Sequence, residues 1–142
     1  MIAVAERFEI ATKGFCDIHD ITDRVQSAVA RHGLGEGLAT VFVPGSTAGI
    51  TTIEYESGAL ADLRRAIERI APQEIHYDHD ARWGDGNGFA HVRAALLGPS
   101  LPVPVTGGRL ALGTWQQIVL VDFDNRPRQR PVVVQLLGAG AS

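Results

Sequence analysis

The stretch Gln117-Ile-Val-Leu-Val-Asp-Phe-Asp-Asn-Arg-Pro-Arg-Gln-Arg-Pro-Val-Val-Val-Gln-Leu-Leu137 decides the fold class of this chain. Its two ends, residues 117–123 and 131–137, are apolar runs of strand length, and its middle is a polar segment that holds three arginines. We predict that the two runs form a β-hairpin and that Arg126, Arg128 and Arg130 lie in its solvated turn.

Outward from this stretch, the chain contains more predicted strands than helices. Helices are expected from Thr22 to Gly33, from a Ser57 cap to before Pro72, and over residues 91–97. Further strands are expected at residues 6–12, 38–43, 50–53, 101–105 and 110–112, and the prolines at 102 and 104 place one of these at a sheet edge. Because most strands follow one another through short turns, we predict a single α+β domain over residues 1–142 with antiparallel or mixed sheets.

Composition limits the possible functions. A chain of 142 residues with 45% hydrophobic and 20% charged residues is typical of one globular domain. A formal net charge of −3 provides no overall basic field, so we expect no nucleic-acid partner. Cys16 is the single cysteine, which excludes an intrachain disulfide, and we expect it to be a small buried hydrophobe. No apolar run approaches membrane-spanning length, so we expect a cytoplasmic protein without membrane association.

The glycine-rich segment from His79 to His91 has the composition of a functional site. Its imidazoles, carboxylates and amide are ligands that suit a divalent metal or a phosphorylated substrate, and they belong to His79, Asp80, Asp85, Asn87 and His91. Its three glycines indicate a backbone in unusual conformations or close to a ligand. The alternative is an ordinary turn, since glycine, asparagine and aspartate dominate turns as well.

Other residues could complete such a site. Ser46 and Thr47 lie on a glycine-flanked turn whose hydroxyl and N–H groups could hold phosphate oxygens. Arg93 and Arg109 carry guanidinium groups that suit bidentate phosphate recognition. Trp83, in a polar loop, could stack on a flat ring.

Four blocks in fixed order carry a resemblance to a known family. They are Pro44-Gly-Ser-Thr-Ala-Gly-Ile-Thr-Thr-Ile-Glu54, Tyr77-Asp-His-Asp80, Asn87-Gly-Phe-Ala-His-Val-Arg-Ala-Ala-Leu-Leu-Gly-Pro-Ser100 and Gly108-Arg-Leu-Ala-Leu-Gly-Thr-Trp-Gln116. Together they resemble the YjbQ-like family, over nearly the whole chain. The resemblance implies a two-sheet β-sandwich core with flanking helices, a homotrimer, and secondary thiamine-phosphate synthase activity. That reaction joins a thiazole phosphate to a pyrimidine methyl diphosphate with loss of pyrophosphate.

The resemblance and the residue types together suggest roles for the candidates. We expect His79, His91 and Glu54 to be catalytic, and His79, His91 and Asp85 to hold a divalent metal, zinc or magnesium. We expect a small phosphorylated molecule to be bound by Ser46, Thr47, Asn87, Trp83 and Arg109. Trp115 is expected in the core or in the trimer interface.

One departure from the family pattern leaves the activity open. The better-known branch begins the first block with histidine, and this chain has Gly45 at that position. The alternative is therefore a non-catalytic trimeric protein that binds a metal or a metabolite. A metal-dependent hydrolase, with Glu54 or Asp85 as its base, is a third class.

Overall fold

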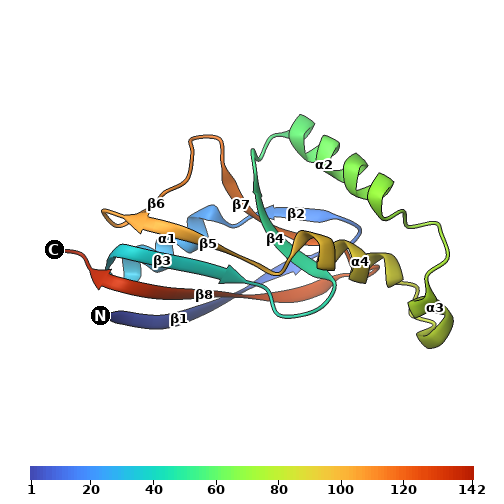
Figure 1. Cartoon of the computed structure of the whole chain (residues 1–142), viewed down its shortest axis with the longest axis horizontal. Coiled ribbons are helices and arrows are strands. Elements are labelled where there is room, and N and C mark those ends of the chain that lie inside the picture. The colour runs from blue at the N-terminus through green and yellow to red at the C-terminus, as the bar shows by residue number, and fades with distance from the viewer.

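Two antiparallel β-sheets form the core of the computed structural model, which describes all of residues 1–142 (Figure 1). The five-stranded sheet has the order β1 (Ile2–Thr12), β8 (Arg128–Gly140), β3 (Leu34–Phe42), β5 (Ser100–Thr106) and β6 (Arg109–Leu110). The three-stranded sheet has the order β2 (Asp17–Asp20), β7 (Gln117–Asp122) and β4 (Ala48–Ile53). The helices are α1 (Thr22–Arg31), α2 (Ser57–Ile70), α3 (Asp78–Trp83) and α4 (Gly88–Leu97). The predicted α+β class and two-sheet architecture are confirmed.

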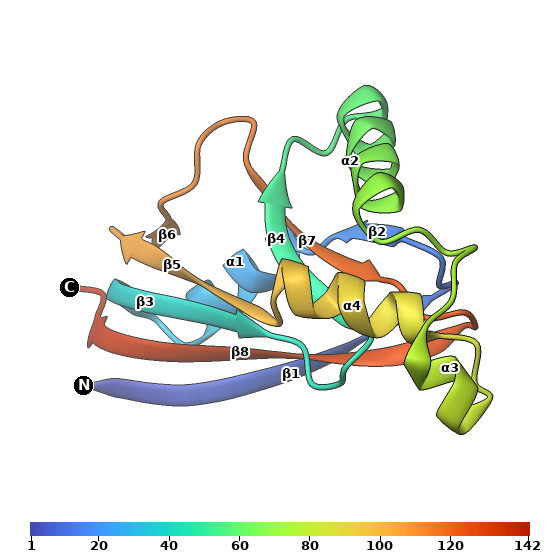
Figure 2. The same cartoon turned by 45° about the vertical axis from the view of Figure 1, so that its right-hand side comes forward.

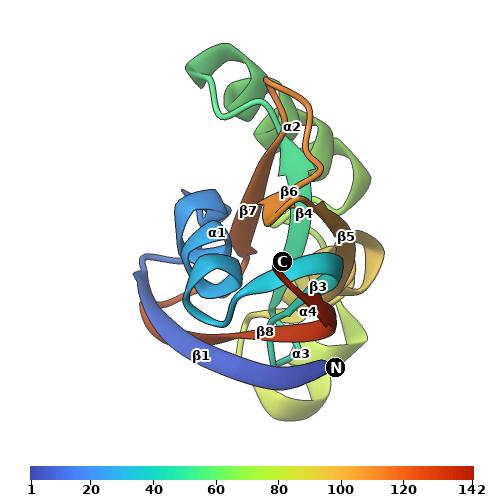
Figure 3. The same cartoon turned by 90° about the vertical axis from the view of Figure 1, so that its left-hand side faces the viewer.

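The five-stranded sheet buries one face by strict alternation along its central strands. In β8 the buried side chains are Val132, Val134 and Leu136, and in β3 they include Ala39 and Val41. Helix α1 contributes its apolar face to the same core, beside the inner face of this sheet (Figure 3). The inner side of the three-stranded sheet completes this main core.

Strand β7 is buried on both faces, which explains its unbroken apolar sequence. Ile118 and Leu120 belong to the main core, whereas Val119 and Val121 belong to a second apolar cluster that includes Phe89. Helices α2 and α4 contribute to this second cluster and flank the three-stranded sheet (Figure 2).

The predicted hairpin between residues 117–123 and 131–137 is wrong. Strand β7 pairs with β2 and β4, and β8 pairs with β1 and β3, so the two strands belong to different sheets. The short segment between Asp122 and Arg128 therefore crosses from one sheet to the other. A strand that buries both faces takes the centre of its own sheet, whereas β8, which alternates, suits the outer sheet of the sandwich.

The element boundaries confirm some local predictions and correct others. The helix expected over residues 91–97 forms, beginning at Gly88. Pro102 lies in β5 where it pairs with β3 alone, at the open edge as predicted, whereas the Pro104 carbonyl also accepts from Ala111 N at 2.8 Å on the other side of β5. Helix α2 is capped by Glu56 rather than by Ser57, because the Glu56 carboxylate accepts hydrogen bonds from the backbone N–H groups of residues 58 and 59. None of the four helices has the length and apolar character needed to cross a bilayer.

Candidate functional site

Two aspartates and two arginines form an ion-pair network where the chain crosses between the sheets, and of the four only Arg128 is partly exposed. Arg130 Nε and Nη2 donate to Asp122 Oδ2 and Oδ1 at 2.7 and 3.0 Å. Arg128 Nε and Nη2 donate to Asp124 Oδ2 at 2.9 and 2.7 Å. Both carboxylates are fully buried, and such charges persist in an interior only when paired and hydrogen-bonded.

Two threonine hydroxyl groups also donate hydrogen bonds to the carboxylates of this network. Thr12 Oγ1 donates to Asp122 Oδ2 at 2.5 Å, and Thr47 Oγ1 donates to Asp124 Oδ2 at 3.0 Å. Burial alone raises the pKa of Asp124, but bonds from Arg128, the Asn125 N–H, Asn87 and Thr47 outweigh it and lower that pKa to about 2. Asp124 is therefore ionised throughout the neutral range.

A polar cavity of about 430 Å³ lies above this network. The loop between β3 and β4, helix α3 with the loop after it, the start of α4, and β8 all contribute to its wall. The ten lining residues are Gly45, Ser46, Thr47, His79, Trp83, Asp85, Asn87, His91, Arg128 and Arg130.

His79 of α3 and His91 of α4 face each other in this cavity. Their ring centroids lie 4.3 Å apart with an interplanar angle of 38°. Burial, followed by the neighbouring His79, lowers the pKa of His91 below its usual value of 6.5. His91 is therefore neutral at neutral pH and can accept a proton or bind a metal. His79 Nδ1 is buried without a hydrogen-bond partner, 3.7 Å from Asp80 Oδ1.

Asn87 lies at the start of α4 and ties the cavity to the ion-pair network. Its Nδ2 donates to Asp124 Oδ1 at 3.2 Å, and its Oδ1 is buried without a partner. Gly88 follows at a close crossing with α3, where a Cβ would lie 2.5 Å from the Cβ of Tyr77. The predicted unusual backbone conformation is confirmed at Gly84 and Gly86, which have φ angles of 73° and 70°, whereas Gly88 is required by its contact with Tyr77.

Most of the predicted site residues converge on this cavity, but Asp80, Glu54, Arg93 and Arg109 do not line it. Ser46, Thr47, Trp83, Asp85 and Asn87 join the two histidines in its wall. Glu54 instead lines a separate hollow with Tyr55 and Trp115. Arg109 lies in β6, at the opposite end of the molecule from α3 (Figure 1). The turn that carries Ser46 and Thr47 thus meets the histidines, while the last family block lies elsewhere.

The expected three-ligand metal centre is not preassembled. The structure brings no three His, Cys, Asp or Glu side chains together as a metal-holding group. The two imidazoles form a pair, and Asp85 lies in the same cavity wall.

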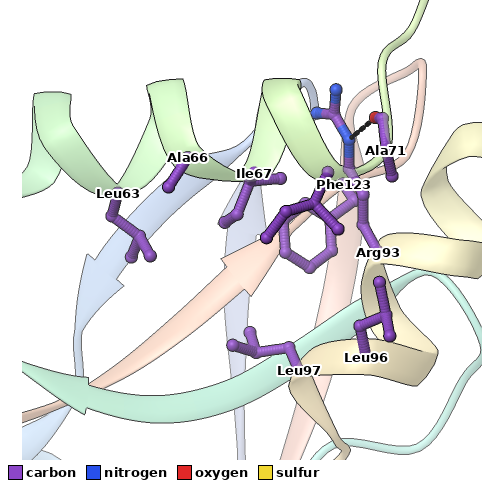
Figure 4. A pocket seen from close by; sticks show the side chains of 9 residues that line it. Leu63, Ala66, Ile67, Ala71, Arg93, Leu96, Leu97 and Phe123 are labelled. Carbon is purple, nitrogen blue, oxygen red and sulfur yellow. Dashed lines mark hydrogen bonds between the residues drawn. The ribbon is translucent and has the colours of Figure 1, made fainter.

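Arg93 has a structural role rather than an anion-binding one. Its Nε donates to the Ala71 carbonyl at 2.9 Å, its Nη2 pairs with Glu68, and its guanidinium carbon lies 4.9 Å from the Phe89 ring centroid. It borders a mostly apolar pocket of about 210 Å³ between α2 and α4 (Figure 4). The Arg93 guanidinium is therefore held by contacts within the fold, and Arg93 does not line the polar cavity.

Arg128 and Arg130 line the cavity, although the sequence pattern did not predict them as site residues. Arg128 and Arg130 were expected in a solvated turn, yet Arg130 is only 6% exposed. A signal was available in the spacing: Asp122 and Asp124 are two residues apart, and so are the two arginines. In extended chain that spacing puts both members of each pair on one face.

Of the predictions for Cys16 and Trp115, one is confirmed and one is corrected. Cys16 is buried, as predicted, and burial raises the pKa of its thiol. Trp115 is 72% exposed, so its expected place in the core is wrong, while an interface role stays a prediction.

Comparison with known proteins gives one consistent result. The family model described as "UPF0047 protein YjbQ-like" matches residues 6–139. A UPF0047 protein of Archaeoglobus fulgidus is 42% identical over 121 residues, which cover 85% of this chain and 91% of that protein. The UPF0047 protein YugU of Bacillus subtilis is 34% identical over 131 residues, covering 92% and 96%. The crystal structure of a YbjQ-like protein of unknown function from Sulfolobus solfataricus P2 has a TM-score of 0.88 and 31% identity, covering 97% of this chain and 100% of that one.

Proposed function

The chain belongs to the YjbQ-like UPF0047 family, and from this premise we propose that its polar cavity is the active site of an enzyme acting on phosphorylated heterocycles. The proposed reaction is that of a secondary thiamine-phosphate synthase. The ring nitrogen of a thiazole phosphate forms a bond to the methylene carbon of a pyrimidine methyl diphosphate. The carbon–oxygen bond breaks, and its electron pair leaves with pyrophosphate.

The observation that carries this proposal is the convergence of His79, His91 and Arg128 on one cavity. Its volume of about 430 Å³ falls within the range of about 300–1,000 Å³ typical of small-molecule sites. Arg128 uses Nε and Nη2 on Asp124, which leaves Nη1 for a phosphate oxygen. Trp83, 64% exposed at the rim, can cover a flat ring.

The histidines supply proton transfer in this proposal. The departing pyrophosphate changes its proton affinity as the bond breaks, and a neutral imidazole such as His91 exchanges protons near neutral pH. Ser46 contributes a hydroxyl at the same wall. The site therefore combines anion recognition with proton transfer, as pyrophosphate loss requires.

A divalent cation, zinc or magnesium, is a further part of the proposal. Asp122 and Asp124 balance the charges of Arg130 and Arg128, so the carboxylate of Asp85 gives the cavity a formal negative charge that the neutral imidazole of His91 does not offset. Two imidazoles and Asp85 would hold the ion, with water completing its coordination, and the bound ion would offset phosphate charge. No step of the proposed reaction depends on it.

The direct test supplies both heterocyclic substrates and measures thiamine phosphate and pyrophosphate. We expect His91→Ala to reduce turnover by about 100-fold or more, because general acid–base catalysis contributes about that much. Glu54→Ala, which alters a residue outside the cavity, should keep full turnover. Binding of both substrates without any product would favour the second candidate, a non-catalytic trimeric metal- or metabolite-binding protein. The presence of Gly45 in place of the family histidine favours this candidate.

A further inference from the structure

The protein leaves two buried side-chain polar atoms without a hydrogen-bond partner, and both belong to the polar cavity. They are Asn87 Oδ1 and His79 Nδ1. Buried polar groups in folded proteins are almost always paired, because an unpaired one loses its hydration without compensation. Two such atoms in one cavity wall indicate that a bound ligand supplies their missing hydrogen-bond partners.

The orientation of the Asn87 amide is fixed by its neighbour. Nδ2 donates to Asp124 Oδ1, and Asp124, with a pKa of about 2, can only accept. A flipped amide would place the carbonyl oxygen of Asn87 against a carboxylate oxygen, which is repulsive. The free atom is therefore the carbonyl oxygen, an acceptor that needs a donor.

Asn87 is also held rigidly by its surroundings. The residue is 8% exposed, and its backbone carbonyl accepts from Ala90 N and His91 N at 2.9 and 3.3 Å as α4 begins. Its side chain cannot turn to find another partner without breaking the bond to Asp124. The acceptor is thus preorganised, which is the condition for strong discrimination between ligands.

We infer that Asn87 Oδ1 is a specificity-determining acceptor. It accepts a hydrogen bond from an N–H or O–H donor on the same small molecule whose phosphate is held by Arg128. Asp124 bonds both Asn87 and Arg128, so the acceptor and the cation lie on either side of one carboxylate. A single small ligand spans that separation. This inference rests on the proposed function and names which reactant the cavity takes.

The chemistry of the two proposed reactants selects one of them. A thiazole phosphate has a ring nitrogen without hydrogen and a hydroxyl already esterified, so it presents no donor beside its phosphate. The pyrimidine methyl diphosphate of the proposed reaction is an aminopyrimidine, and its exocyclic amine carries two N–H groups. The cavity at Asn87 is therefore the aminopyrimidine site, with the amine on Oδ1.

The test measures binding of three probes by calorimetry: inorganic phosphate, an aminopyrimidinylmethyl phosphate, and its deamino analogue. The wild-type protein should bind the amino compound about 10-fold or more tightly than the deamino one, since the latter leaves the acceptor unpaired. Asn87→Ala should bring that ratio close to one while still binding inorganic phosphate. Gln116→Ala, which removes a surface amide bonded to Thr52, should preserve the wild-type ratio.

The outcomes separate this inference from the function on which it rests. Equal wild-type affinity for the two pyrimidines, with inorganic phosphate still bound, overturns the role of Asn87 and leaves the proposed phosphate site standing. Failure of the wild type to bind phosphate or either pyrimidine overturns both. An unchanged ratio in Asn87→Ala assigns the amine to another group. If Asn87→Ala does not fold, Asn87→Ser replaces it, and the wild-type comparison remains decisive.

Discussion

Asp124 combines complete burial with full ionisation, and this makes it sensitive to acid. Its pKa falls from 3.8 to about 2 on folding, a difference that corresponds to about 2 kcal/mol of stability. Because the folded value is the lower one, the contribution is present in full above about pH 4. It is lost progressively as the pH falls through about 2.

We expect urea unfolding to show this loss between about pH 4 and pH 2. Asp124→Asn should flatten that part of the profile, because the titrating group is gone, and should also lower stability at pH 7 by leaving Arg128 without its partner. Asp62→Asn, at a side chain that is 73% exposed, should change neither. The same acid slope in wild type and Asp124→Asn would contradict the assignment.

The anion site gives a second prediction at the scale of single residues. Phosphate, with or without magnesium, should raise the midpoint of thermal unfolding of the wild-type protein, because a ligand that binds the native state stabilises it. Arg128→Lys should reduce that rise, since an ammonium cannot serve Asp124 and a phosphate as a planar guanidinium does. Arg109→Lys, in β6, should leave it unchanged. Equal responses from the two variants would mean that phosphate acts through general surface charge.

The family histidine cannot simply be restored at Gly45. This residue has φ of 118°, and a Cβ there would lie 3.1 Å from Nη1 of Arg130, which Asp122 holds in place. We expect Gly45→His to lose about 1–3 kcal/mol of unfolding free energy, the usual cost of a strained backbone conformation. Ser46→His, one residue on, should be tolerated better. Comparable chemical-denaturation midpoints for the two variants would refute the strain argument.

Residue composition predicted the cavity better than it predicted the ions beneath it. The histidines and Asn87 were identifiable because they occur close together in a glycine-rich segment, and Ser46 and Thr47 because they lie in a glycine-flanked turn. The role of Arg128 was not, because it depends on which sheet β8 joins. Glu54 and Arg109 were assigned to the site only because they lie in the family-like sequence blocks. Membership of such a block does not determine where a side chain lies in the folded protein.

Strand pairing sets the limit of sequence reasoning at the scale of elements. Adjacent strands with a short connection usually pair, so a β7–β8 hairpin was the expected topology. The distinguishing information lies in the burial of both faces of β7, which requires knowing that α2 and α4 cover the far side. The cap of α2 was missed for a local reason, since glutamate is an uncommon N-cap residue.

The close pairing of β3 and β8 gives a prediction at the scale of elements. Gly37 pairs with Gly138, and a Cβ on Gly138 would lie 2.1 Å from the carbonyl oxygen of Glu36. Gly138→Ala should therefore force the strands apart and cost about 1–3 kcal/mol, as overpacking does. Gly140→Ala, whose added Cβ meets nothing closer than 3.8 Å, is the matched control. Equal unfolding midpoints for the two variants would show that the sheet relaxes at no cost.

The outer face of the five-stranded sheet bears on the whole molecule. Leu38 and Leu137 pair across β3 and β8 and are 44% and 48% exposed, and Phe42 on the same strand is 40% exposed. An apolar face of this kind is typical of an interface between protein chains, and it would suit the homotrimer that the family resemblance implies.

Light scattering at micromolar concentration should therefore report a mass of three chains. Leu38→Asp, at the centre of the exposed face, should shift the mass toward one chain, because a charge buried between copies is unfavourable. Arg65→Asp, which changes an exposed charge on α2, should leave the trimer intact. A monomeric wild type, or a Leu38→Asp variant as trimeric as the wild type, would remove this face from consideration.

The ion pair between Asp122 and Arg130 joins the two sheets where the chain crosses between them. Arg130 also lines the cavity, so separation of the two sheets at this end would disrupt the cavity wall. We therefore expect local opening of the two sheets at this end to be coupled to release of a bound ligand. Amide hydrogens of β7 and β8 should then exchange with solvent as a single cooperative unit, slowed together whenever the cavity is filled.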